Sequence, residues 1–161
     1  MIKVKAIMLS AVMLLGMGLV AVPQAMAGGS GLENWRLPWG LEFGKPISAK
    51  LKRIGSFNKR RNQLTLAGDV RLKVKEGALI KVGFIEKVPK AFRRLGLVID
   101  KGKVDAIGIV RRQGGKITDI SKEYGDFNVT FASSPYSFFF NMGMGEGKLN
   151  SLWVSEKLED F

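Results

Sequence analysis

Residues 143–148, G-M-G-E-G-K, have the composition of a loop that could bind a phosphate group. The three glycines would let backbone N–H groups approach an anion, and Lys148 would add a positive charge. A phosphate loop, however, needs a helix directly after the lysine, because the helix N-terminus faces the anion. Residues 149–154 instead place Leu, Trp and Val at strand spacing. We therefore expect a hairpin turn between strands, with Gly147 at a positive φ.

Acidic side chains are the remaining residues that could do chemistry. The chain has no histidine and no cysteine, which removes the commonest general base, thiol nucleophiles and the preferred zinc ligands. Asp119, Glu123 and Asp126 lie within eight residues, where a metal site or an acid–base pair is one interpretation. The favoured alternative is a solvated helix face, because no acid lies beside a candidate nucleophile. We predict no enzyme activity and no cofactor, with a small hydrolase that uses an atypical carboxylate site as the alternative.

Basic residues are concentrated in one stretch of a chain whose net charge is +12. Residues 45–75 hold ten lysines and arginines but a single acid, Asp69. Two interpretations stay open: a solvated face, or a surface that binds lipid A phosphates, anionic headgroups or an acidic protein. Nucleic acid is not expected, because no aromatic residues alternate with the basic ones for base stacking. The candidate anion- or partner-binding residues are Lys59, Arg60, Arg61, Arg71, Lys73 and Lys75.

The first 27 residues resemble a secretory signal peptide. Two lysines precede a long apolar run, and Ala25-Met26-Ala27 forms an A-x-A cleavage site before Gly28. An uncleaved membrane anchor is the alternative, but the apolar run is at the short limit for a span. We therefore expect a periplasmic or secreted protein of bacterial type. We also expect no lipid anchor and no transmembrane span in the mature chain.

Hydrophobic periodicity predicts how the mature chain is organised. Residues 28–34 are expected to form a flexible leader, and residues 35–161 a single α+β domain. We predict an antiparallel β-meander with two short helices on one face; two unequal helix-plus-strands units, about 40–112 and 113–161, are an alternative description. The expected helices are 46–54 and 119–124, and the expected strands are 41–43, 64–75 (with a break at Gly68), 78–88, 92–100, 104–111, 127–132, 136–142 and 149–157.

Three short motifs resemble those of known small exported bacterial proteins. They are G-L-E-F-G-K-P-I-S at 40–48, K-E-Y-G-D-F at 122–127 and I-D-K-G-K-V at 99–104. They are similar to motifs of the SmpA/OmlA (BamE-like) outer-membrane assembly lipoproteins and of beta-lactamase-inhibitor-protein-like domains. The resemblance implies a helix-plus-sheet domain that binds protein partners, although the cysteine that carries the lipid in SmpA/OmlA proteins is absent here. We expect an exported, non-enzymatic binding module, with an inhibitor of a secreted enzyme as the alternative.

Overall fold

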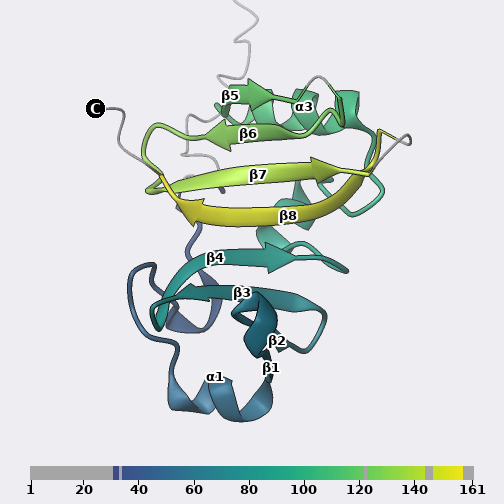
Figure 1. Cartoon of the computed structure of the whole chain (residues 1–161). Helices are drawn as coiled ribbons and strands as arrows, with labels where there is room; N and C mark the ends of the chain where they lie inside the picture. Colours follow the sequence, from purple (N-terminus) through teal and green to yellow (C-terminus); the bar gives the residue numbers. More distant parts are fainter. Residues whose placement is uncertain (1–30, 33, 122, 144–146, 158–161) are drawn as a thin grey trace, which may run out of the picture.

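The computed structural model describes residues 31–32, 34–121, 123–143 and 147–157. These residues form an antiparallel sheet of eight strands in the order β1-β2-β3-β4-β8-β7-β6-β5 (Figure 1). The predicted α+β class with an antiparallel sheet is confirmed. The predicted signal peptide, with its cleavage site, lies outside the described residues and stays a prediction. The strands are β1 (Ser56–Asn58), β2 (Gln63–Leu66), β3 (Val70–Lys75), β4 (Ala78–Phe84), β5 (Lys116–Ile120), β6 (Phe127–Thr130), β7 (Tyr136–Met142) and β8 (Leu149–Glu156).

The helices in the described residues are short and lie against one face of the sheet. Phe92 of α2 packs on Phe138 of β7, with ring centroids 5.5 Å apart. Buried Leu51 of α1 and Val110 of α3 belong to the same hydrophobic core. None of the helices in the described residues covers the opposite face of the sheet, which carries Lys73, Lys81, Phe139 and Trp153 and which we call the open face. The helices are α1 (Ala49–Ile54), α2 (Lys90–Arg94) and α3 (Lys103–Arg112), with 3₁₀ turns η1 (Pro38–Gly40) and η2 (Lys59–Arg61).

Two four-stranded meanders make up the sheet. β1–β4 follow α1, β5–β8 follow α2 and α3, and the two sets join where β4 pairs with β8. That junction is only three residue pairs long, Val82 to Phe84 against Leu152 to Val154. The structure thus has two helix-plus-strands units, but the predicted boundary at 112/113 is wrong. α3 precedes the second set of strands, so the division falls between β4 and α2.

The start of the domain also differs from the prediction. Leu32 lies in the predicted leader, yet its side chain is fully buried in the core. The carbonyl of Leu32 also accepts a hydrogen bond from the Trp35 N–H, at 3.3 Å. The packed domain therefore begins before Trp35.

The predicted strand at 104–111 is wrong, because these residues form α3. Its buried residues are Ala106, Ile109 and Val110, which follow the helical spacing i, i+3, i+4. Asp105 in the first turn and Arg111 in the last turn complement the helix dipole. The strand was predicted because Ile107 and Ile109 are apolar residues at alternate positions, but both residues lie in the helix.

Three other predicted elements also differ. The helix expected at 119–124 is replaced by β5, whose residues 119–120 pair with β6. The strand expected at 92–100 is replaced by α2 and a loop that buries Leu97. No strand forms at 41–43, which follows the 3₁₀ turn η1. In each case strand pairing or burial against distant residues overrode the local pattern.

Other predicted elements are confirmed. α1 begins after Ser48, whose hydroxyl oxygen accepts a hydrogen bond from the Leu51 N–H, and it lies within the expected helix. The predicted break at Gly68 is a hairpin turn between β2 and β3, with Gly68 at φ 71°. The β7–β8 hairpin closes with Met142 opposite Leu149. A strand therefore follows Lys148, and the phosphate-loop interpretation of 143–148 is wrong.

Replacing Gly147 with valine should destabilise the domain by about 1 kcal/mol or more, because a β-branched residue is strained at positive φ. Gly147 has φ 60°, and an added Cβ would meet no atom within 4 Å, so the cost is conformational rather than steric. Gly147→Asn is the matched control, since asparagine tolerates this region far better. Urea unfolding of both variants measures the difference. Equal stability of the valine variant and the parent would contradict the assignment.

Candidate functional site

The hairpin turn between β1 and β2 presents three consecutive cations. Lys59, Arg60 and Arg61 form η2, and all three side chains are exposed. The side chain of Asn58 accepts a hydrogen bond from the Arg61 N–H at 3.2 Å, which caps the turn. Asn62 then leaves the turn at φ 47°, a conformation that asparagine adopts more readily than most residues. We call residues 59–61 the basic tip.

The end of β3 lies beside the basic tip. Gln63 pairs with Lys73, and the Val74 N–H donates to the Asn62 carbonyl at 2.9 Å. The next residue, Lys75, is exposed at the β3–β4 turn. A two-residue turn with both residues at positive φ closes this hairpin tightly. Lys75 therefore lies at the same end of the sheet as the basic tip.

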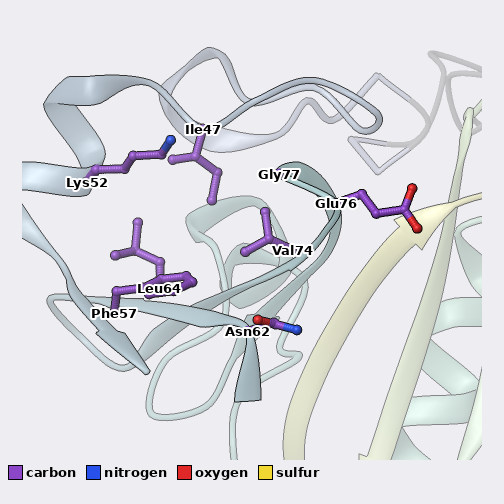
Figure 2. A pocket seen from close by; sticks show the side chains of 8 residues that line it. All are labelled: Ile47, Lys52, Phe57, Asn62, Leu64, Val74, Glu76 and Gly77. Atoms are coloured by element: carbon purple, nitrogen blue, oxygen red, sulfur yellow. The ribbon is translucent and has the colours of Figure 1, made fainter. Parts of the chain in front are cut away.

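A hollow of about 500 Å³ opens at this end of the sheet. Figure 2 shows Ile47, Leu64 and Val74 pointing into it, while Glu76 points away. The remaining lining residues are Lys52, Phe57, Asn62 and Gly77. The walls are thus largely apolar, and α1, β1, β2 and the β3–β4 turn supply them.

Basic residues adjoin this hollow: Lys52 lines it, and the basic tip and Lys75 are sequence neighbours of the lining residues Asn62, Val74 and Glu76. Two large apolar side chains remain in water, Ile54 at 68% exposed and Phe57 at 52%. Phe57 is both exposed and part of the wall of the apolar hollow, which favours a contact surface here. We call the five cations and these two apolar residues the basic end: Lys52, Lys59, Arg60, Arg61, Lys75, Ile54 and Phe57.

Two of the six predicted site residues do not join the basic end. Arg71 forms a bidentate ion pair with Asp69, through contacts of 2.9 and 2.7 Å. The hydrogen bond to the Asp69 carboxylate raises the pKa of Arg71. The positive charge of Arg71 is compensated by the negative charge of Asp69. Lys73 lies on the open face, with its Nζ atom 5.1 Å from the centre of the Trp153 ring. The structure thus brings together Lys59, Arg60, Arg61 and Lys75, and separates Arg71 and Lys73 from them.

Sequence reasoning missed the apolar part of the site. Ile47 and Lys52 reach the hollow from the α1 segment, and Phe57 reaches it from β1. The one signal available was Phe57 itself, an aromatic residue directly before the run N-K-R-R-N. Its exposure depends on β1 being an edge strand, which the sequence pattern does not reveal.

Of the three clustered acidic residues, Asp126 has a structural role. The carboxylate of Asp126 accepts hydrogen bonds from the Met142 N–H at 2.7 Å and from Asn141 Nδ2 at 3.1 Å. It thereby fixes the end of β7. The helix that was expected to carry Asp119 does not exist. Within the described residues, no group of three or more acidic side chains is placed to hold a metal ion.

Comparison with known proteins adds little to this geometry. No protein-family model matches the sequence, and no curated protein matches it significantly. The crystal structure of a DUF4309 family protein, YjgB from Bacillus subtilis subsp. subtilis str. 168, superposes with a TM-score of 0.37 at 10% identity, over 71% of this chain and 73% of that one. A superposition this loose carries no argument about this chain. In the part of the chain that the structure describes, no helix has the length and apolar character needed to cross a bilayer.

Proposed function

We propose that this chain is an exported, non-enzymatic binding module of the bacterial envelope that attaches to an anionic lipid surface through the basic end. The observation that supports the proposal is an apolar hollow whose wall contains Lys52 and the exposed Phe57, with the basic tip and Lys75 directly next to the lining residues Asn62, Val74 and Glu76. A solvated face would need the cations but not the exposed apolar side chains.

The two kinds of side chain act on different parts of a bilayer. Each lysine or arginine near an anionic leaflet contributes about 1 kcal/mol of attraction, and the effect decays within a Debye length of about 8 Å at physiological salt. Phe57 and Ile54 would enter the boundary between headgroups and acyl chains, where burial of apolar area is favourable. Neither effect alone gives firm attachment, but together they favour an anionic membrane over free anions in solution.

Binding should therefore depend on both lipid charge and salt. We expect the protein to sediment with phosphatidylglycerol-containing vesicles but not with pure phosphatidylcholine vesicles. Affinity should fall about tenfold or more as salt rises from low to physiological concentration, because the attraction is screened. Equal binding to both vesicle types, or binding to neither, would contradict the proposal. A protein partner recovered from periplasmic extract, together with no vesicle binding, would favour an acidic protein surface instead.

A further inference from the structure

Two lysines lie directly opposite one another on the open face. Lys73 of β3 and Lys81 of β4 are cross-strand partners. Like charges in this position are destabilising. In the described part of the chain, no carboxylate lies within 4 Å of either ammonium group, since the ion pairs there are Arg71–Asp69 and Lys101–Asp105. Among the residues that the structure describes, the two lysines therefore have no ion-pair partner of opposite sign.

Aromatic rings hold the two ammonium groups in place. Lys81 Nζ lies 5.5 Å from the centre of the Phe139 ring and 5.9 Å from that of Trp153. Lys73 Nζ lies 5.1 Å from the Trp153 ring. Such cation–π contacts orient a lysine without neutralising it. Burial lowers the pKa of Lys81, and the charge of Lys73 lowers it further.

The position of Trp153 depends on a glycine. A Cβ atom at Gly83 would lie only 2.6 Å from the Trp153 ring, so the ring packs directly on the β4 backbone at Gly83. The indole Nε1–H donates to Ser151 Oγ at 3.2 Å. The backbone at Gly83 and the hydrogen bond to Ser151 thus hold the Trp153 ring in place, while part of the ring remains exposed to solvent.

A trough of about 500 Å³, lined mainly by polar residues, lies farther along the sheet toward β5. Ser137 and Ser155 are cross-strand partners in the trough, two residues from Phe139 and Trp153 on the same face. Asn128 and Thr130 extend the polar lining onto β6. Lys116, Lys157 and Glu156 also line it, so its formal charge is positive.

We propose that the open face binds an acidic polysaccharide, with Lys73 and Lys81 facing its carboxylates or sulfates and the trough of Ser137 and Ser155 facing its hydroxyls. Each sugar unit of such a chain has an apolar ring face for the aromatic side chains, hydroxyls for the trough and an anion for the lysines. Most residues that line the trough are polar or charged, which favours sugar hydroxyls over a lipid tail. This site is independent of the proposed lipid attachment, since the two share no residue.

Calorimetry with three probes tests the proposal: oligogalacturonate, the same oligomer with its carboxylates methyl-esterified, and polyphosphate of equal charge. We expect binding of oligogalacturonate, at least tenfold weaker binding of the ester, and at least tenfold weaker binding of polyphosphate. Polyphosphate binding as tight as oligogalacturonate would show a simple charge patch and overturn the proposal. Absence of oligogalacturonate binding would overturn it as well.

Lys81→Met separates charge from packing, because methionine keeps an apolar stem over the rings. We expect at least tenfold weaker oligogalacturonate binding, with the melting temperature within about 3 °C of the parent. The matched control is Lys87→Met, an exposed lysine away from this face, which should leave binding unchanged. Vesicle binding should be the same in both variants, so failure of the glycan site does not imply failure of lipid attachment. Unchanged glycan binding in Lys81→Met would overturn the proposal.

Discussion

Reversing the three charges of the basic tip, with Lys59→Glu, Arg60→Glu and Arg61→Glu combined, should weaken binding to anionic vesicles by about 100-fold or more. Removing three cations that each contribute about 1 kcal/mol accounts for about 100-fold, and the added negative charges increase the loss. All three side chains are exposed and form no ion pair within the described residues, so the fold should be retained. Vesicle sedimentation measures the affinity, and circular dichroism checks the fold.

A second triple variant controls for net charge. Lys87, Lys90 and Arg94 are also exposed but lie around α2, away from the hollow. Their reversal to glutamate changes the net charge by the same amount and should cost much less affinity. Equal losses in the two variants would show that total charge, not the basic end, drives attachment. Reversing Arg71 and Lys73 is a poorer test, because Arg71 pairs with Asp69 and Lys73 contacts Trp153.

Phe138→Ala should cost about 3–5 kcal/mol of unfolding free energy, the usual range for removing a fully buried phenylalanine. The Phe138 ring has no exposed surface, and it lies within about 6 Å of four other rings, those of Trp35, Phe92, Phe131 and Tyr136. These rings come from the N-terminal segment, α2 and the second meander. Deleting their common neighbour should therefore loosen several elements at once, and the loss is about a fifth or more of the stability typical of a domain.

The adjacent Phe139→Ala is the matched control. Phe139 lies on the open face and is only partly buried, so its loss should cost about 1 kcal/mol. Urea unfolding of both variants gives the two free energies. A cost for Phe139→Ala equal to that of Phe138→Ala would contradict the assignment of the two faces.

Strands with one buried and one exposed face were predictable from the sequence. Val70 and Leu72 alternate with Arg71 and Lys73, and this pattern identifies β3 because the side-chain period of a strand is two. Turn residues such as Gly68 and Gly147 marked the hairpins for a related reason, since each needs a positive φ. Side-chain alternation and the conformational freedom of glycine were sufficient to predict these strands and turns, because both are properties of the local chain.

Elements that depend on tertiary contacts were not predictable in this way. The segment that forms α3 was predicted as a strand from the alternation of Ile107 and Ile109, although its buried residues follow a helical spacing. The same Gly-Lys pair stands at the start of α3, at 102–103, and before β8, at 147–148. Gly102 and Lys148 in fact form an isolated bridge with each other, so two segments that look alike lie side by side rather than playing equivalent roles.

The candidate site was predictable only as a set of charges. The basic tip was identified as a loop, but its position beside Lys75 follows from the β2–β3 register. Arg71 and Lys73 differ from the other cations because Arg71 pairs with Asp69 and Lys73 contacts the Trp153 ring. Trp153 is about 80 residues away in the chain, so the sequence pattern did not reveal this contact. The pairing of Lys73 with Lys81 likewise depends on strand register, which the alternation of side chains constrains but does not fix.

Hydrogen–deuterium exchange with and without phosphatidylglycerol vesicles tests the central claim most directly, because it locates the membrane contact on the chain. We expect slower exchange in peptides that cover α1, β1 and the basic tip, together with the β3–β4 turn at Glu76 and Gly77. Peptides that cover β6 and β7 should exchange at the same rate in both conditions. Protection confined to β5–β8, or no protection at the basic tip when the protein is vesicle-bound, would contradict attachment through the basic end.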